Sequence, residues 1–259
     1  MSPDFVFSED VPEWLLQHYQ VFLIPFMVYP IMVHMWPKSM HVDASNKVVR
    51  ALLFAWNVKL AMFSVVLVYH LSPPLFTRLA LQGYDMTVCL HYIDDSYLMR
   101  PYGRWVFAFV LSKIPELGDT FFLLLRDKNV PFLHWYHHLI TLLFVYVQAV
   151  LLIETAEWVT WMNAVVHSFM YSYYAISVYA PNHVRGLCTL LTGLQVAQMF
   201  HGMFLTGYHI VACGNCPIKD YPGFLLYTIY ACMFTKYFAQ RYLPSISPST
   251  SMKMKMKAV

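Results

Sequence analysis

Charged residues are scarce in this sequence of 259 residues. Asp, Glu, Lys and Arg make up 12% of it, while 59% of its residues are hydrophobic. A soluble domain carries about 25% charged residues. A soluble core could not bury this much apolar surface, so the composition indicates a protein whose solvent is the lipid bilayer. The net charge of +3 is too small to indicate a nucleic-acid partner.

Cysteine is also rare, and a basic leader is absent. Among the five cysteines, Cys213 and Cys216 have the spacing of a zinc or redox motif. A zinc ribbon needs a second such pair, which the sequence lacks, so that class of site is excluded. Residues 1–19 contain no Lys or Arg, and therefore lack the basic segment that opens a cleavable signal peptide.

Long apolar runs, in contrast, are abundant. They are continuous rather than alternating, which favours helices over a β-barrel, and roughly 20 apolar residues span a bilayer. The longest connection, 72–103, begins with Ser72-Pro73-Pro74, and we expect it to be a loop. We expect a single all-α membrane domain over residues 1–259, with seven transmembrane helices within 20–242, at 20–36, 48–71, 104–125, 132–152, 158–180, 186–210 and 221–242.

Lys and Arg residues are distributed unevenly over the predicted connections. When the seven segments alternate, one side collects Lys38, Lys47, Arg50, Arg126, Lys128, Arg185, Arg241, Lys253, Lys255 and Lys257. The other side collects Arg78, Arg100, Arg104 and Lys219. Cytoplasmic loops carry the excess of basic residues, so we expect a lumenal N-terminus at 1–19 and a cytosolic tail at 243–259. The last lysines of the tail resemble a dilysine signal for retrieval to the endoplasmic reticulum.

The segment 104–125 places charged residues inside a predicted span. A charge at mid-bilayer costs about 2.5–3.5 kcal/mol on insertion scales, and it generally faces a cavity or a partner. Lys113, Glu116 and Thr120 lie about one turn apart on one helix face, with Asp119 beside them. The pattern indicates either an ion pair that joins helices or a polar wall that lines a reaction cavity.

The segment 132–152 opens with three histidines on one helix face. His134, His137 and His138 are spaced i, i+3 and i+4. A hydrogen bond between packed helices would explain one of them but not all three. Neutral imidazoles in this pattern can bind a metal or act as nucleophiles and general bases. The spacing alone leaves both readings open.

A third polar face runs along the segment 158–180. Asn163, His167, Tyr171 and Tyr174 recur on it over about three turns. Gln195 in the segment 186–210 could bond helices together or contact a substrate. We therefore expect a helical bundle around one polar chamber that continues into an apolar tunnel.

Taken in order, these motifs resemble the ELO family of very-long-chain fatty acid elongases. The Trp135-Tyr136 pair between the histidines resembles the subgroup that acts on saturated and monounsaturated chains. The resemblance extends from about residue 50 to 245 and includes Trp56-Asn57. Its other residues are Lys113-x-x-Glu116-x-x-Asp119-Thr120, His134-x-x-His137-His138, Asn163-x-x-x-His167-x-x-Met170-Tyr171-x-Tyr173-Tyr174 and Thr192-x-x-Gln195.

The resemblance implies a fold and a reaction. Six of seven helices would surround a closed-ended acyl tunnel in the endoplasmic reticulum membrane. A long-chain acyl-CoA would condense with malonyl-CoA to give 3-ketoacyl-CoA, carbon dioxide and CoA, with no cofactor, no metal and no cysteine nucleophile. The implied partners are the ketoacyl-CoA reductase, the dehydratase and the enoyl-CoA reductase of the elongation cycle, and homodimerisation is left open.

Two other classes of protein compete with this reading. Membrane di-iron desaturases and hydroxylases share the His-x-x-His-His box, but they need further histidine boxes. This chain has one such box, and its other histidines, among them His167, His201 and His209, are scattered. A non-catalytic lipid transporter would release no CoA when supplied with acyl-CoA and malonyl-CoA.

We assign expected roles to the polar residues on this basis. His137 would take the acyl group as a nucleophile, and His167 would hold or polarise the reacting carbonyl. Asn163 and Tyr171 would donate to the developing negative charge. A histidine that acts only as a base is the alternative mechanism. His134 and His138 would orient the site, and the expected substrate contacts are Lys113, Glu116, Asp119, Tyr174 and Gln195.

The phosphates of CoA are expected at the cytosolic mouth of the bundle. Arg126 and Lys128 precede the histidine box there, and Lys236 lies near the end of the last segment. Lys and Arg are the usual phosphate partners. The positive-inside bias would by itself also place Arg126 and Lys128 on that side.

The cysteines allow one further expectation. In this topology the connections that contain Cys89 and the Cys213/Cys216 pair both face the lumen, where disulfides persist. We predict that Cys89 bonds either Cys213 or Cys216. A link between Cys213 and Cys216 is the alternative.

Overall fold

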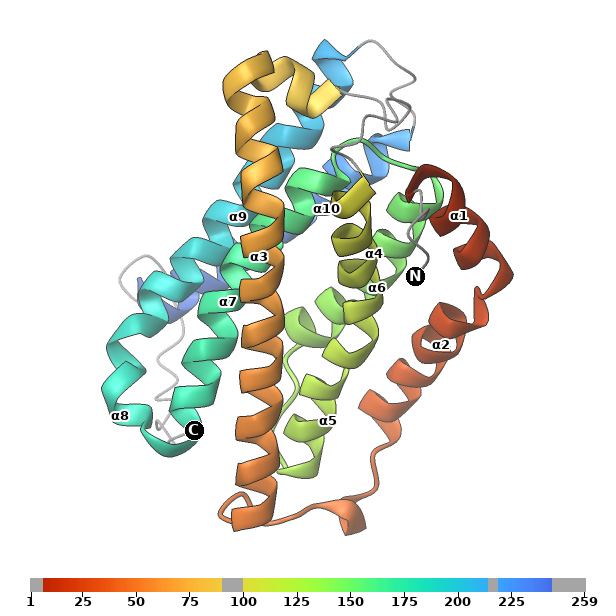
Figure 1. The fold of residues 1–259 in the computed structure, drawn as a ribbon. Coiled ribbons are helices and arrows are strands. Elements are labelled where there is room, and N and C mark those ends of the chain that lie inside the picture. Colours follow the sequence, from red (N-terminus) through yellow and green to blue (C-terminus); the bar gives the residue numbers. More distant parts are fainter. Residues whose placement is uncertain (1–6, 90–99, 214–218, 244–259) are drawn as a thin grey trace.

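The computed structural model describes residues 7–89, 100–213 and 219–243, and helices make up almost all of this part (Figure 1). No strand is present among these residues. The α-helices are α1 (Phe7–Gln17), α2 (Gln20–Met35), α3 (Lys47–Cys89), α4 (Arg100–Glu116), α5 (Gly118–Leu125), α6 (Phe132–Val150), α7 (Ala156–Tyr179), α8 (Pro181–Val184), α9 (Cys188–Ala212) and α10 (Tyr221–Tyr242). Two short 3-10 helices, η1 (Lys38–Met40) and η2 (Arg185–Leu187), lie between them.

All seven predicted apolar segments lie on helices. Of the described helices, α3 alone is long and apolar enough to cross a membrane by itself. The stretches Asp10–Gln17 and Gln20–Met35, which meet at 55°, qualify only when taken together as a bent pair. The all-helical fold therefore agrees with the prediction, while seven crossings and a closed tunnel stay predictions.

The distribution of polarity is reversed relative to a soluble protein. Lys113 and Glu116 are only 4% and 6% exposed, whereas Ile24 on α2 and Met62 on α3 are 60% and 64% exposed. Ionisable side chains inside a membrane bundle face its interior, and apolar side chains face lipid. The exposed apolar surface is thus the surface that a bilayer would cover.

The expected loop at 72–103 is wrong over its first half, because α3 continues through Pro73 and Pro74 to Cys89. Neighbouring groups stabilise the helix at this point: the Ser72 hydroxyl donates to the Val68 carbonyl, and the Trp161 indole of α7 donates to Ser72. Membrane helices tolerate proline where side chains and neighbouring helices make contacts of this kind. The residues 90–99 lie outside the described part.

The last turns of α3 follow a kink at Gly83, whose φ of 81° only glycine adopts readily. Before the kink, Arg78 forms a buried ion pair with Glu157 of α7. We had placed Arg78 in a lumenal loop. Its ion pair with Glu157 instead joins α3 to α7, and this contact stabilises α3 beyond its prolines.

The segment predicted as one helix over 104–125 is divided into α4 and α5. α4 ends at Glu116, one residue beyond Pro115, which has no N–H to donate. α5 begins at Gly118, where a Cβ would lie 2.7 Å from the Trp56 ring. The break therefore lets Trp56 of α3 approach the backbone closely, and it turns Asp119 toward α3.

Two apolar cores hold the bundle together. One joins α1, α2, α4 and α6 and includes Tyr29 and Leu142. The other joins α7, α9 and α10 and includes Leu205. α3 contributes Leu71 to the first core and Leu75 to the second, and it packs along α7. It is thus the central support of the fold (Figure 1).

The α2–α3, α5–α6 and α7–α9 connections lie at one end of the bundle, and the α6–α7 turn lies at the other (Figure 1). At one end, the Val42 amide donates to the Leu125 carbonyl at 2.7 Å, and Arg50 donates to the Val178 carbonyl of α7 at 2.7 Å. At the other end lie Cys89, the turn between α6 and α7, and the start of α10. The alternation of seven crossings and the side of the membrane on which each end lies both stay predictions.

Candidate active site

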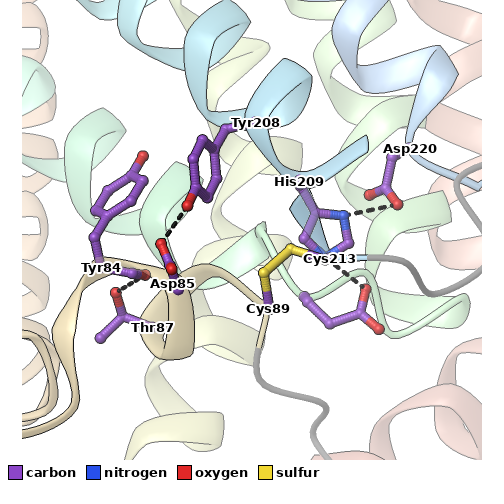
Figure 2. The surroundings of a disulfide bond; sticks show 9 residues. Tyr84, Asp85, Thr87, Cys89, Tyr208, His209, Cys213 and Asp220 are labelled. Carbon is purple, nitrogen blue, oxygen red and sulfur yellow. Dashed lines mark hydrogen bonds and ion pairs between the residues drawn. A yellow bond between two sulfur atoms is a disulfide. The ribbon is translucent and has the colours of Figure 1, made fainter. Parts of the chain in front are cut away.

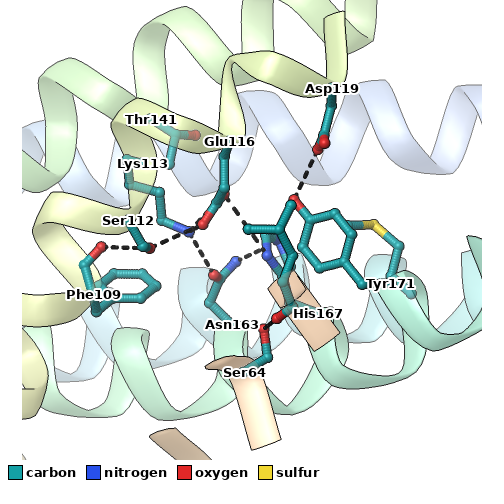
Figure 3. Close-up of polar contacts among 12 residues, drawn as sticks. Ser64, Phe109, Ser112, Lys113, Glu116, Asp119, Thr141, Asn163, His167 and Tyr171 are labelled. Carbon is teal, nitrogen blue, oxygen red and sulfur yellow. Dashed lines mark hydrogen bonds and ion pairs between the residues drawn. The ribbon is translucent and has the colours of Figure 1, made fainter. Parts of the chain in front are cut away.

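A buried polar network lies between α4 and α7 (Figure 3). Lys113 Nζ lies 2.8 and 3.0 Å from the two carboxylate oxygens of Glu116 and donates to Asn163 Oδ1 at 2.9 Å. Asn163 Nδ2 lies 3.1 Å from His167 Nε2, and Glu116 Oε2 lies 3.8 Å from His167 Nδ1. Ser112 also donates to Glu116 at 3.0 Å. The ion pair of the first alternative is thus present and joins α4 to α7, whereas a polar wall that lines a reaction cavity stays a prediction.

Asp119 belongs to a second set of contacts. Its two carboxylate oxygens accept from the Trp56 indole of α3 and the Tyr171 hydroxyl of α7, each at 2.8 Å. One carboxylate therefore joins three helices beside the first network. The hydroxyl proton of Tyr171, which we expected to face a substrate, is directed at Asp119 instead.

The first histidine of the box, His134, is fixed through Thr120. His134 Nε2 lies 3.0 Å from Thr120 Oγ1, which in turn lies 2.7 Å from the buried Tyr29 hydroxyl of α2. His138 lies one turn further along α6, with 4.5 Å between the two ring centroids. These contacts fix the position of the His134 ring, and the orienting role expected for it stays a prediction.

His137 has its own polar neighbours. Its Nδ1 lies 3.4 Å from the Thr141 hydroxyl, which contacts the Tyr230 hydroxyl of α10 at 3.1 Å. Thr141 follows His137 by four residues and so shares its helix face. The contact between Thr141 and His137 could therefore be predicted from their spacing in the sequence. The contact with Tyr230 could not, because Tyr230 lies on a separate helix.

The histidine face of α6 and the network between α4 and α7 meet in the interior. His137 lies close enough to His167, Lys113 and Glu116 to interact with them electrostatically, and His138 does so with His167 and Lys113. The bundle thus brings together imidazoles, an amide, an ammonium and a carboxylate from three helices. This set offers nucleophiles, bases and hydrogen-bond donors in one enclosed place.

The other predicted site residues lie at the margins of this arrangement. Tyr174 is 42% exposed, and Gln195 donates to the sulfur of Met170 at 3.4 Å. Lys236 is exposed on α10. Arg126 and Lys128 lie in the turn before α6, at the end opposite the disulfide.

A disulfide joins Cys89 at the end of α3 to Cys213 after α9 (Figure 2). Cys213 is one of the two partners that we considered for Cys89. Cys216 lies outside the described residues. The bond links parts of the chain 124 residues apart, and it closes the end of the bundle that contains the α6–α7 turn.

Comparison with known proteins places these residues in context. The chain matches the sequence profile of the GNS1/SUR4 family, named ELO, over residues 14–250. It is 36% identical to very long chain fatty acid elongase 6 of Drosophila melanogaster over 203 residues, which are 75% of this chain and 63% of the fly protein. It is 32% identical to fatty acid elongase 3 of Trypanosoma brucei brucei in an alignment, gaps included, of 265 positions that covers 89% of this chain and 86% of the trypanosome protein. With very long chain fatty acid elongase 3 of Mus musculus it shares 30% identity over 249 residues, or 94% and 90%.

Proposed function

The chain belongs to the ELO (GNS1/SUR4) family of fatty acid elongases, and from this membership we propose that it is a very-long-chain 3-oxoacyl-CoA synthase. It condenses a saturated or monounsaturated long-chain acyl-CoA with malonyl-CoA in the endoplasmic reticulum membrane. The observation that carries the proposal is the meeting of the α6 histidines with the Lys113–Glu116–Asn163–His167 network.

The first half of the reaction forms an acyl-enzyme on His137. A hydrogen bond from Nδ1–H to Thr141 would fix the tautomer and leave the Nε2 lone pair free to attack. Nε2 forms a bond to the acyl carbon, the carbon–sulfur bond breaks, and CoA leaves as the thiol after it takes up the proton that Nδ1 loses. An acyl-imidazole stays reactive, so one difficult step becomes two easier ones.

The second half begins when malonyl-CoA replaces CoA. The carbon–carbon bond to the free carboxylate breaks, carbon dioxide leaves, and the resulting enolate attacks the acyl carbon. The bond to His137 then breaks, the released imidazole takes up one proton from water, and 3-ketoacyl-CoA departs. Negative charge develops on oxygen in both halves. Asn163 Nδ2 can only donate to His167 Nε2, so the neutral imidazole carries its proton on Nδ1, and this N–H would polarise that oxygen.

CoA itself belongs at the end of the bundle that contains Arg126 and Lys128. Burial, and secondarily the nearby Arg50, lower the pKa of the Arg126 guanidinium, so two cations share this region. Two adjacent guanidinium groups favour an anion, and the phosphates of CoA would supply one. The acyl chain would then extend from this mouth toward the histidines.

The acyl-enzyme can be tested by intact mass and CoA release. With acyl-CoA alone, the wild-type protein should release one CoA per active chain and gain one acyl mass. His137→Ala should lose both, whereas His183→Ala, which removes an exposed histidine of α8, should retain both. A full single turnover of CoA release by His137→Ala would refute the nucleophile. Release without any acyl mass in the wild type would favour a histidine that acts only as a base.

A further inference from the structure

Tyr29 lies on α2, at the margin of the bundle (Figure 1). Much of this helix is apolar and exposed, as Ile24 and Ile31 are at 60% and 56%. Tyr29 is only 2% exposed, and its helix packs against α5 and α6. A tyrosine that is buried this deeply needs a partner for its hydroxyl group. The condensation proposed above gives it no role.

Ring contacts hold α2 against α6 on both sides of Tyr29. The ring centroid of Phe22 lies 5.0 Å from that of Tyr146. Further along α2, the ring centroid of His34 lies 5.4 Å from that of Trp135. Tyr29 falls between these two contacts, so the packing of its own helix fixes the level at which its side chain enters the bundle.

Two hydrogen bonds in series connect Tyr29 to the histidine box. The Tyr29 hydroxyl lies 2.7 Å from Thr120 Oγ1, which lies 3.0 Å from His134 Nε2. Thr120 is fully buried. Neither hydroxyl has another hydrogen-bond partner among the described residues. Thr120 thus differs from Thr206, which donates to the Gly202 carbonyl of its own helix.

The two bonds satisfy every proton in one direction only. If His134 Nε2 carried a proton, it would donate to Thr120, and Thr120 would donate to Tyr29. The hydroxyl proton of Tyr29 would then be buried without an acceptor, which is unfavourable. In the other direction Tyr29 donates to Thr120, and Thr120 donates to the Nε2 lone pair of His134. The neutral imidazole then carries its own proton on Nδ1.

This tautomer leaves an N–H donor on the side of the ring away from Thr120. His134 is half-buried, and its Nδ1 makes no hydrogen bond with a described residue. His138 is its neighbour on the next turn of α6, with 4.5 Å between ring centroids. A donor stabilises the negative oxygen that forms in both halves of the condensation, whereas a lone pair in its place would repel that oxygen.

We propose that Tyr29 is a positioning residue of the condensation site, which acts through Thr120 to hold His134 in the Nδ1–H tautomer. Its hydroxyl keeps Thr120 Oγ1 turned toward His134 and away from the carbonyls of α5. The use of the Nδ1–H group in the reaction rests on the function proposed above, whereas the tautomer does not. The tautomer should therefore be the same in an inactive His137→Ala protein.

Nitrogen NMR reads the tautomer directly, because protonated and unprotonated ring nitrogens of histidine have well-separated shifts. Full-length protein labelled with ¹⁵N-histidine should show a neutral imidazole whose Nδ1 is protonated and whose Nε2 is not. Its signals are assigned to His134 by their absence from His134→Gln or His134→Asn. A proton on Nε2 of His134 in the wild-type protein would overturn the proposal, and this measurement needs no variant of Tyr29.

Tyr29→Phe keeps the ring and removes the hydroxyl. Thr120 is then free to turn to a carbonyl of its own helix, which is a common alternative for threonine. His134 Nε2 loses its donor, so the Nε2–H form should appear, and kcat should fall by about twofold or more with little change in KM. A Tyr29→Phe protein with the wild-type His134 spectrum and the wild-type kcat would refute the role of Tyr29.

Two further variants separate this role from a general effect on packing. Tyr146→Phe removes a hydroxyl of the same apolar core, which contacts the Leu15 carbonyl at 3.4 Å, and it should change neither the His134 spectrum nor kcat. Tyr29→Phe combined with Thr120→Val should be no slower than Thr120→Val alone, because Tyr29 acts through Thr120. Additive losses in the double variant would show that Tyr29 acts by another route, and would overturn the proposal.

Discussion

Replacement of Lys113 by Met tests whether the buried network is held together by charge. Lys113 Nζ lies within 3.0 Å of both Glu116 oxygens, and it also reaches Asn163. With Met at position 113 the Glu116 carboxylate stays buried, and Ser112 is its remaining hydrogen-bond donor among the described residues. Removal of one partner from a buried ion pair costs about 3–5 kcal/mol.

That loss is large enough to measure directly. A change of 1 kcal/mol moves the unfolding midpoint of a chain of this size by about 2–4 °C. We therefore expect Lys113→Met to lower the midpoint by about 6–20 °C, measured by tryptophan fluorescence on detergent-solubilised protein. Lys128→Met removes a lysine in the turn before α6, and it is the matched control that should shift the midpoint by only a few degrees.

The double variant Lys113→Met/Glu116→Met separates stability from activity. Replacing both partners of a buried pair by apolar residues is often neutral for stability. The unfolding midpoint of the double variant should therefore rise most of the way back to the wild-type temperature. Condensing activity should not return, because Asn163 still lacks the ammonium that fixes its amide beside His167. A double variant as unstable as the sum of its two single variants would refute the reasoning, since the two charges would then not compensate each other.

Three further variants test other parts of the structure. Gly118→Ala should push the Trp56 ring away from the start of α5 and weaken its bond to Asp119, which would lower both the midpoint and the activity; a fully active protein would contradict this. Cys89→Ser should lower stability by about 2–5 kcal/mol and should match wild type treated with reductant, whereas a free Cys213 thiol in unreduced wild type would exclude the bond. Lys236→Ala should raise the Michaelis constant for both CoA substrates and leave chain preference unchanged; a change in chain preference alone would assign Lys236 to the acyl tunnel.

The helices were predictable because each one corresponds to a continuous apolar run in the sequence. The expected segment 132–152 corresponds to α6 at Phe132–Val150, and the expected segment 221–242 to α10 at Tyr221–Tyr242. Continuous apolar runs have this property, since a helix in lipid satisfies its own backbone hydrogen bonds. The error at Pro73 arose because proline is a local signal, while Trp161 and Glu157 on another helix stabilise α3 beyond it.

The site was predictable only one helix at a time. Spacing correctly placed Lys113 beside Glu116, because neighbours at i, i+3 are fixed by the helix itself. It could not show that Asp119 bonds Trp56 and Tyr171, because contacts between helices depend on how each helix is rotated about its own axis.

The same limit explains why a buried cluster of Glu154, His209 and Asp220 escaped the sequence analysis. The three residues fall in a turn, on a helix end and at a helix start, with separations that follow no helical period. Histidine at 209 looked like one of the scattered histidines that argue against a di-iron enzyme. Only the fold gives it two carboxylates as neighbours. The clustering of such residues is therefore a property of tertiary structure, and a search by motif alone would miss it in any chain where the members come from three separate elements.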